Sequence, residues 1–109
     1  MKINLLCIGK TDDKEIKNLI NYYITRLPRH WNFEITEIPD VKNSRNLTAD
    51  LLKKEEAKLF FNTIDNTDWV ILLDEKGKQF TSREFAQKLD FYQNNSIKRI
   101  CFLVGGAYG

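Results

Sequence analysis

Apolar residues along the chain form patterns that predict alternating strands and helices. Two runs of five apolar residues, Trp69–Leu73 and Ile100–Val104, end at polar residues or glycine. Such runs are typical of central strands in a parallel sheet, which are covered on both faces. Two more strands are predicted at Lys2–Ile8 and Phe33–Ile38. In Phe33–Ile38 apolar and polar residues partly alternate, so this strand is expected nearer an edge of the sheet.

The first helix is predicted between the first two strands. Asp12 or Asp13 can accept hydrogen bonds from the free N–H groups at its start. Pro28 stops the helix, so that Leu27 is its practical end. We therefore expect an amphipathic helix with one apolar side. That side consists of Ile16, Leu19, Ile20, Tyr23, Ile24 and Leu27.

Two further helices complete the pattern. One covers roughly Leu47–Ile64, and another starts at a capping box made by Thr81 and Glu84. The buried side of the Leu47–Ile64 helix is predicted to hold Leu51, Leu52, Leu59, Phe60 and Ile64. The order β-α-β-α-β-α-β predicts an α/β fold, with a parallel sheet, right-handed crossovers and helices on both faces. We expect residues 1–109 to form a single α/β domain.

Composition excludes several classes of protein. The chain is 42% hydrophobic and 29% charged, as is typical of a soluble domain with one core. No apolar run has the length of a membrane span, and the first residues lack the features of a signal peptide. Cys7 and Cys101 lie in strand-like runs, so we expect buried thiols and a cytoplasmic location. His30 is the only histidine, and no metal site is predicted.

The carboxyl ends of the two apolar strands are the best candidate site. Parallel sheets present their ligand crevice at this edge, where Leu73 precedes Asp74 and Val104 precedes Gly105 and Gly106. Glycine lets a ligand approach the main chain closely. Main-chain groups at Leu73 and Gly105 are therefore candidates for contacts with an adenine or a ribose. The alternative is that both segments are simply loops between strands and helices, and the sequence does not decide between the two.

Basic residues near three turns form a second candidate site. The formal net charge of +2 is too small to indicate nucleic-acid binding unless these residues gather on one surface. Together they would form a phosphate-binding patch, and scattered solvent-facing charge is the alternative. The residues are Lys10, Arg26, Arg29, Lys42 and Arg45.

Six short segments resemble one enzyme family, in the same order along the whole chain. The family is the ribosomal RNA large-subunit methyltransferase H family. Its members are SPOUT-class α/β-knot enzymes that methylate N3 of a pseudouridine. The segments are Lys2–Lys10, Tyr23–Pro28, Glu34–Pro39, Leu72–Lys78, Ser82–Ala86 and Phe102–Gly106.

The resemblance implies a cofactor, a substrate and a partner. S-adenosyl-L-methionine would be the methyl donor, the ribosome with its large-subunit rRNA the substrate, and a second copy of the chain the partner in a homodimer. Leu73, Gly105 and Gly106 match positions at which the family holds its cofactor. The family usually has a proline and an acidic residue between its glycines, where this chain has Ala107–Tyr108. No residue of this chain is assigned as the catalytic base.

Length separates two hypotheses. Family members continue for a further segment that forms the knot, so residues 1–109 are expected to be the amino-terminal two-thirds of such an enzyme. On that reading the 109-residue form binds S-adenosylmethionine weakly or not at all, and an apolar patch is exposed near Phe102 and Tyr108. The alternative hypothesis is a non-catalytic α/β module that binds RNA or a protein through its basic turns.

Overall fold

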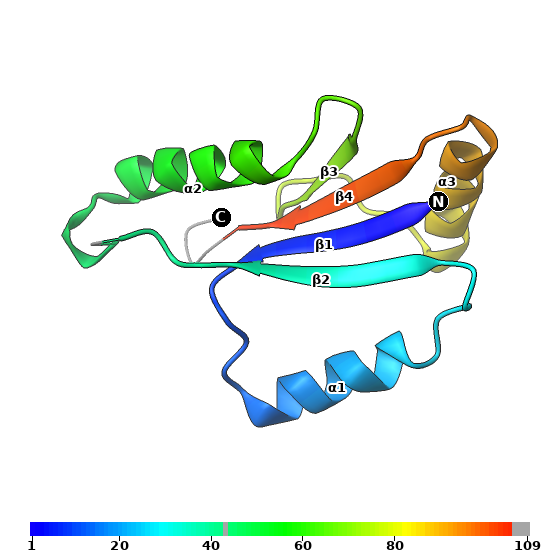
Figure 1. Ribbon diagram of the computed structural model, residues 1–109, viewed down its shortest axis with the longest axis horizontal. Helices are drawn as coiled ribbons and strands as arrows, with labels where there is room; N and C mark the ends of the chain where they lie inside the picture. Colours follow the sequence, from blue (N-terminus) through cyan, green and yellow to red (C-terminus); the bar gives the residue numbers. More distant parts are fainter. Residues whose placement is uncertain (43, 106–109) are drawn as a thin grey trace.

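The computed structural model describes residues 1–42 and 44–105. Figure 1 shows strands and helices alternating along the chain. Both the predicted element order and the predicted α/β class are confirmed. The elements are β1 (Lys2–Ile8), α1 (Lys14–Ile24), β2 (Asn32–Ile38), a 3-10 turn η1 (Ser44–Asn46), α2 (Ala49–Thr63), β3 (Trp69–Leu73), α3 (Ser82–Asn94) and β4 (Arg99–Val104).

The four strands form one parallel sheet in the order β2-β1-β4-β3. β3 and β4 are neighbours, β4 is central and β2 lies at an edge, as predicted. The prediction of a central β3 is wrong: β3 forms the other edge of the sheet that the described residues build. A fully apolar run indicates a strand with a strong preference for burial. It does not indicate which strands become its neighbours, because that depends on the crossovers.

Helices cover both faces of the sheet, and the core is divided between them (Figure 1). Side chains of a strand point alternately to the two faces, so β4 contributes to both halves. Toward α2, Cys101 and Leu103 pack with Phe60. Toward α3, Ile100 and Phe102 pack with Leu89 and other residues of that helix face. The predicted helices on both faces are therefore confirmed.

Two predicted helix starts are confirmed by their caps. Asp13 Oδ1 accepts hydrogen bonds from the N–H groups of Glu15 and Ile16 at 2.8 and 3.2 Å. Thr81 Oγ1 accepts from the N–H of Glu84 at 3.1 Å, and Glu84 Oε1 accepts from the N–H of Thr81 at 3.3 Å. These bonds satisfy donors that a helix leaves unpaired at its start. Local sequence is sufficient to place both helix starts.

The apolar side of α1 is not buried. The helix ends at Ile24, three residues before the predicted Leu27, and none of its residues is buried. Leu19 and Tyr23 are among its exposed apolar residues, and Figure 1 shows α1 beside the sheet rather than closely against it. The amphipathic pattern was predicted correctly, but the described part of the chain supplies no full partner for it.

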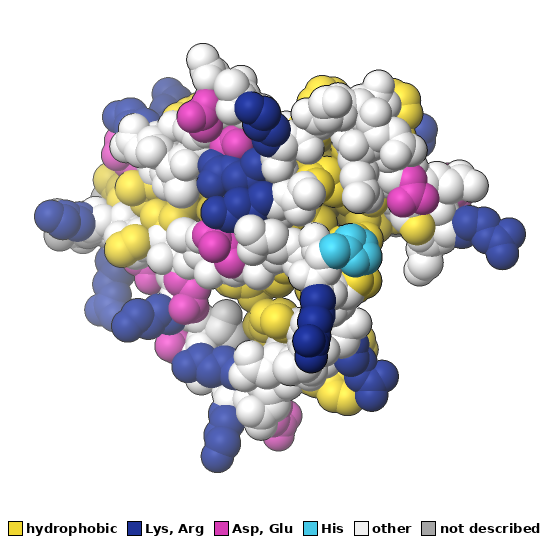
Figure 2. Space-filling view, turned by 45° about the vertical axis from the view of Figure 1, so that its right-hand side comes forward, with side chains coloured by type: hydrophobic (Ala, Val, Ile, Leu, Met, Phe, Trp, Pro, Cys, Tyr) yellow, Lys and Arg dark blue, Asp and Glu magenta, His cyan; other side chains and the backbone are white. Residues whose placement is uncertain are grey.

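Part of the exposed apolar surface lies near Phe102, as the sequence predicts. Phe102 itself is buried, with its ring centroid 6.0 Å from that of Phe85, and Tyr108 lies outside the described residues. Val104 on β4 and the neighbouring Leu73 on β3 are exposed, and further exposed apolar side chains lie on α1 and α2. Figure 2 shows hydrophobic side chains open at the surface between Lys and Arg side chains. The predicted exposed apolar patch near Phe102 is therefore present among the described residues, although α3 covers the ring of Phe102 itself.

A buried ion pair joins the amino ends of β3 and β4. The side chain of Asp68 is only 4% exposed, and it accepts hydrogen bonds from Arg99 Nε at 2.8 Å and from Arg99 Nη2. Cys101 Sγ lies 3.6 Å from the same carboxylate. The bonds from Arg99 lower the pKa of Asp68 below its ordinary value, against the opposing effect of burial. This pair tethers the loop before β3 to the central strand.

We expect Leu103→Ala to lower the free energy of unfolding by about 2–5 kcal/mol, because truncating a buried leucine leaves a cavity. Leu72→Ala is the matched control, since Leu72 pairs with Leu103 across β3 and β4 but is 55% exposed, against 8% for Leu103. The control should cost less than about 1 kcal/mol. Urea unfolding measures the free energy of unfolding of both variants. Equal losses in Leu103→Ala and Leu72→Ala would contradict a central β4.

Asp68→Asn should lower the free energy of unfolding at pH 7 by about 3 kcal/mol, because it leaves the Arg99 charge without its partner. A carboxylate with a lowered folded pKa stabilises the fold above its unfolded pKa and loses that effect as the pH falls through the folded pKa. The difference in the free energy of unfolding between Asp68→Asn and the natural protein should therefore become smaller below about pH 4.

Glu34→Gln is the control for this change. Glu34 pairs with Lys2 at 3.9 Å on the surface, where such pairs contribute about 0–1 kcal/mol. Urea unfolding at pH 7 and pH 3 compares the two variants. A loss for Asp68→Asn that is no larger than the control's, or that is equal at both pH values, would refute the role of the pair.

Candidate ligand crevice at the carboxyl edge of the sheet

The structure brings the ends of β3 and β4 together. Leu73 and Val104 are register partners in adjacent parallel strands, and Gly105 follows Val104 directly. Leu73 is exposed and Gly105 is partly buried. Gly106, the third predicted cofactor residue, lies outside the described residues. Main-chain groups at Leu73 and Gly105 thus share one edge of the sheet, as the sequence predicts.

An apolar cavity opens beside this edge on the α2 face. It has a volume of about 390 Å³ and is lined by Phe60 and Ile64 of α2, by Leu72 and Leu103 of the sheet, and by Gly105. Lys53 and Glu56 add polar groups from α2. A concave, mostly apolar site with few polar groups is the usual environment of a small ligand.

The side chain of Leu73 does not share this cavity. Side chains alternate along a strand, so Leu72 points toward α2 while Leu73 points to the opposite face. Leu73 can therefore approach a ligand in the crevice only through its main chain. Gly105 lines the cavity without a side chain, which leaves room for a ligand to contact its main chain closely.

A second hollow, of about 500 Å³, lies at the ends of β1 and β2. Gly9 turns the chain there with a positive φ of 82°, and its N–H donates to Ile38 O at 2.7 Å. A residue with a side chain would be strained at this φ, and its Cβ would also lie 3.0 Å from a carboxylate oxygen of Asp40, which would have to shift. Lys10 shares this hollow with Glu37 and Asp40. These carboxylates make the hollow a poor site for phosphate.

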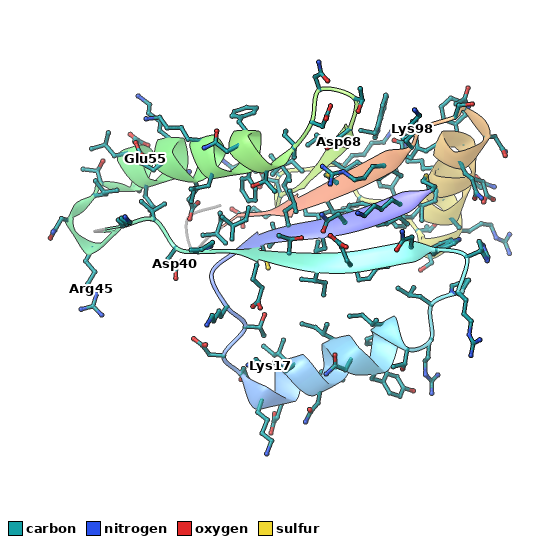
Figure 3. All side chains as sticks on the ribbon, viewed as in Figure 1. Lys17, Asp40, Arg45, Glu55, Asp68 and Lys98 are labelled. Carbon is teal, nitrogen blue, oxygen red and sulfur yellow. The ribbon has the colours of Figure 1, made fainter. Side chains whose placement is uncertain are left out.

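The predicted basic patch is divided between the two ends of the sheet. Arg26 and Arg29 lie between α1 and the start of β2, whereas Lys42 and Arg45 follow the end of β2. Figure 3 shows Arg45 beyond the carboxyl edge, far from the end of α1. The seven residues of β2 separate the two pairs by about 20 Å. The structure does not bring the four residues together, because successive turns in a β-α-β unit alternate between opposite edges.

Two further sequence interpretations concern cysteine and metal. Cys101 is buried and Cys7 is partly buried, and both thiols are free. Burial raises the pKa of Cys7, and the nearby charge of Glu37 adds to this effect, so the thiol stays protonated at neutral pH.

Within the described ranges, no group of three or more His, Cys, Asp or Glu side chains lies close enough to hold a metal ion. No helix in those ranges is long and apolar enough to span a membrane.

Sequence reasoning missed the contribution of α2 to the crevice. Phe60 and Ile64 were predicted to be buried, but not to border the site. Their spacing of four residues places them on one side of the helix, and this was the available signal. Only the packing of α2 over β3 and β4 shows that this side faces the cavity next to Gly105.

Comparison with known proteins gives consistent matches over the whole chain. Residues 1–109 match a family described as "Predicted SPOUT methyltransferase". The chain is 44% identical to the ribosomal RNA large subunit methyltransferase H of Christiangramia forsetii, over 100% of this chain and 69% of that protein. It is 47% identical to the protein of the same name from Cytophaga hutchinsonii, over 100% of this chain and 70% of that protein. For the Parabacteroides distasonis protein of that name the identity is 43%, with coverage of 100% and 69%.

Proposed function

The chain belongs to the SPOUT methyltransferase family, and on this premise we propose that it uses S-adenosylmethionine to methylate N3 of a pseudouridine in large-subunit ribosomal RNA. The names of its relatives support ribosomal RNA as the substrate class. The observation that carries the proposal is the parallel pairing of β3 and β4, which places Leu73 and Gly105 at one edge beside an apolar cavity.

The residues at this edge fit the proposed cofactor. S-adenosylmethionine supplies an electrophilic methyl group on a positively charged sulfur. Its adenine needs an apolar surface, and the cavity beside Gly105 offers one. Leu73 and Gly105 would hold the cofactor through main-chain groups, together with Gly106.

Methylation of N3 requires that its proton leaves as the new N–C bond forms. The protein would contribute by holding N3 in line with the methyl group and by excluding water from the crevice. A positioned acceptor for the N3 proton would add to the rate. We assign no residue of this chain to that role.

We further propose that the protein acts as a homodimer in the cytoplasm. The family resemblance implies the dimer, and the exposed apolar residues of α1, such as Leu19 and Tyr23, are surface that a second subunit would bury. The free thiols of Cys7 and Cys101 fit a reducing compartment.

Methyl transfer tests the proposed function directly. Large ribosomal subunits that lack pseudouridine methylation are incubated with the natural protein and S-adenosylmethionine that carries a labelled methyl group. Mass spectrometry of the digested rRNA should then show one labelled N3-methylpseudouridine. Absence of label from the rRNA, or label on a different base, would refute the proposal.

Gly105→Leu should weaken the affinity for S-adenosylmethionine at least tenfold, because the new side chain fills space beside the cavity. Gln93→Leu is the control, since it adds the same side chain to an exposed position of α3 away from the crevice. Calorimetric titration with the cofactor measures both affinities. Natural affinity in Gly105→Leu would exclude this edge as the cofactor site.

The two basic pairs should act as separate contacts with the ribosome. Arg26→Gln with Arg29→Gln, and Lys42→Gln with Arg45→Gln, should each weaken binding to large subunits and reduce the slope of log K against log salt by about one unit per residue. The double variant Lys17→Gln with Lys54→Gln removes two exposed charges from α1 and α2 and serves as control. If substitution of a pair changes the slope no more than the control does, the charges of that pair face solvent and do not contact the ribosome.

A further inference from the structure

A groove of about 600 Å³ lies between α3 and the start of β3. We call it the lysine–aromatic groove, and it includes residues of β3, of the loop before α3 and of α3 itself. Figure 2 turns the α3 end of the molecule forward and shows Lys and Arg side chains next to hydrophobic surface. The six residues that define the groove are Trp69, Lys78, Phe80, Lys88, Phe91 and Tyr92.

The aromatic rings of the groove are open to solvent. Phe91 is 61% exposed, Trp69 46% and Phe80 37%. Tyr92 connects two of them, with ring centroids 5.1 Å from Trp69 and 6.0 Å from Phe91. Trp69, Tyr92 and Phe91 therefore form a continuous strip of rings. Flat aromatic groups such as nucleobases stack well on side chains of this kind.

Two ammonium groups converge on one of these rings. Lys88 Nζ lies 4.9 Å and Lys78 Nζ 5.6 Å from the centroid of Phe80. Neither ammonium forms an ion pair with a carboxylate anywhere in the described ranges. Glu84 also lines the groove, but its carboxylate accepts the N–H of Thr81 in the helix cap. Two like charges near one ring repel each other, so an anion between them would be favourable.

The groove lies at the edge opposite the crevice. The turn after Leu73 is closed by a bond from Gly77 N–H to Asp74 O at 2.9 Å, and the chain then runs back to α3, which lies at the amino ends of the strands (Figure 1). The groove is beside Trp69 at the start of β3, so the five residues of the strand, or about 15 Å, separate it from the crevice. A polymer whose target nucleotide lies in the crevice would have to extend over this distance along the sheet to reach the groove.

We propose that the lysine–aromatic groove binds a single-stranded segment of the RNA substrate that flanks the target nucleotide. Bases stack on Phe91 and Trp69, and phosphates lie between Lys78 and Lys88. Interleaved aromatic and cationic side chains are the usual composition of single-strand binding surfaces, because every base has a stacking face and every nucleotide a phosphate. The inference rests on RNA being the substrate, as proposed above, but it concerns a different surface from the crevice.

The test uses the natural protein and a fluorescent single-stranded oligoribonucleotide of 15 nucleotides with mixed sequence. Lys78→Gln with Lys88→Gln should weaken binding at least tenfold and reduce the salt slope by about 1.4, which corresponds to two phosphate contacts on a single strand. Phe91→Leu should weaken binding at least fivefold with an unchanged salt slope, because it removes stacking and no charge. Circular dichroism and thermal unfolding confirm that each variant is folded.

Two controls make the result specific. Lys17→Gln with Lys54→Gln removes the same total charge away from the groove, and its affinity should stay within twofold of the natural protein. An RNA duplex of equal length should bind less tightly than the single strand, since its bases cannot stack on side chains. Equal loss of affinity in the two lysine pairs, or no effect of Phe91→Leu, would overturn the proposal. Natural affinity in all groove variants would overturn it as well.

Methyl transfer to large subunits separates this inference from the proposed function. Suppose that the natural protein methylates rRNA, and that the groove variants bind the oligonucleotide and methylate rRNA as well as the natural protein does. The groove proposal then fails and the proposed function stands. If no methyl is transferred but the groove variants lose oligonucleotide binding, the function fails and the groove stands. If both hold, the groove variants should raise KM for the ribosomal substrate and leave kcat unchanged.

Discussion

The rest of the structure depends on the burial of β4 between β1 and β3. Ile100 and Phe102 pack toward α3, while Cys101 and Leu103 pack toward α2. Apolar burial is the main favourable term in folding, and here one strand connects both halves of the core. Because β4 is central, it also determines where the neighbouring strands end, and hence where the ligand crevice lies.

The two ends of β4 serve different purposes. At its amino end, Arg99 holds Asp68 and the loop before β3 in place through a largely buried ion pair. At its carboxyl end, Gly105 meets the end of β3 beside an apolar cavity. The stabilising charges are thus kept at the edge opposite the crevice, where they do not alter the electrostatics of the proposed cofactor site.

The surfaces proposed to bind RNA are distributed over the molecule rather than gathered in one patch. One basic pair lies at each end of β2, and the lysine–aromatic groove lies beyond β3 at the other side of the sheet. A folded RNA that covers the crevice would meet charge on several sides, and aromatic surface on one. Contacts with phosphates position a nucleic acid, whereas contacts with unstacked bases distinguish its single-stranded parts.

The sequence alone determined the local structure and the family. Helix caps at Asp13 and Thr81 depend on residues two or three positions apart. The apolar run of β4 by itself predicts a buried strand. The resemblance to methyltransferases depends only on the order of short segments, so it could be recognised without the fold, and it pointed to the edge at which Leu73 and Gly105 meet.

Only the tertiary structure decided which residues become neighbours across the chain. It placed β3 at an edge of the sheet, left α1 exposed, separated Arg26 from Arg45, and brought Lys78 and Lys88 to the same aromatic ring. The periodicity of apolar residues indicates which side of an element prefers burial, but it does not identify the element that will cover that side. The partner is chosen by crossovers and by helices packing over the sheet, and these depend on the whole chain at once.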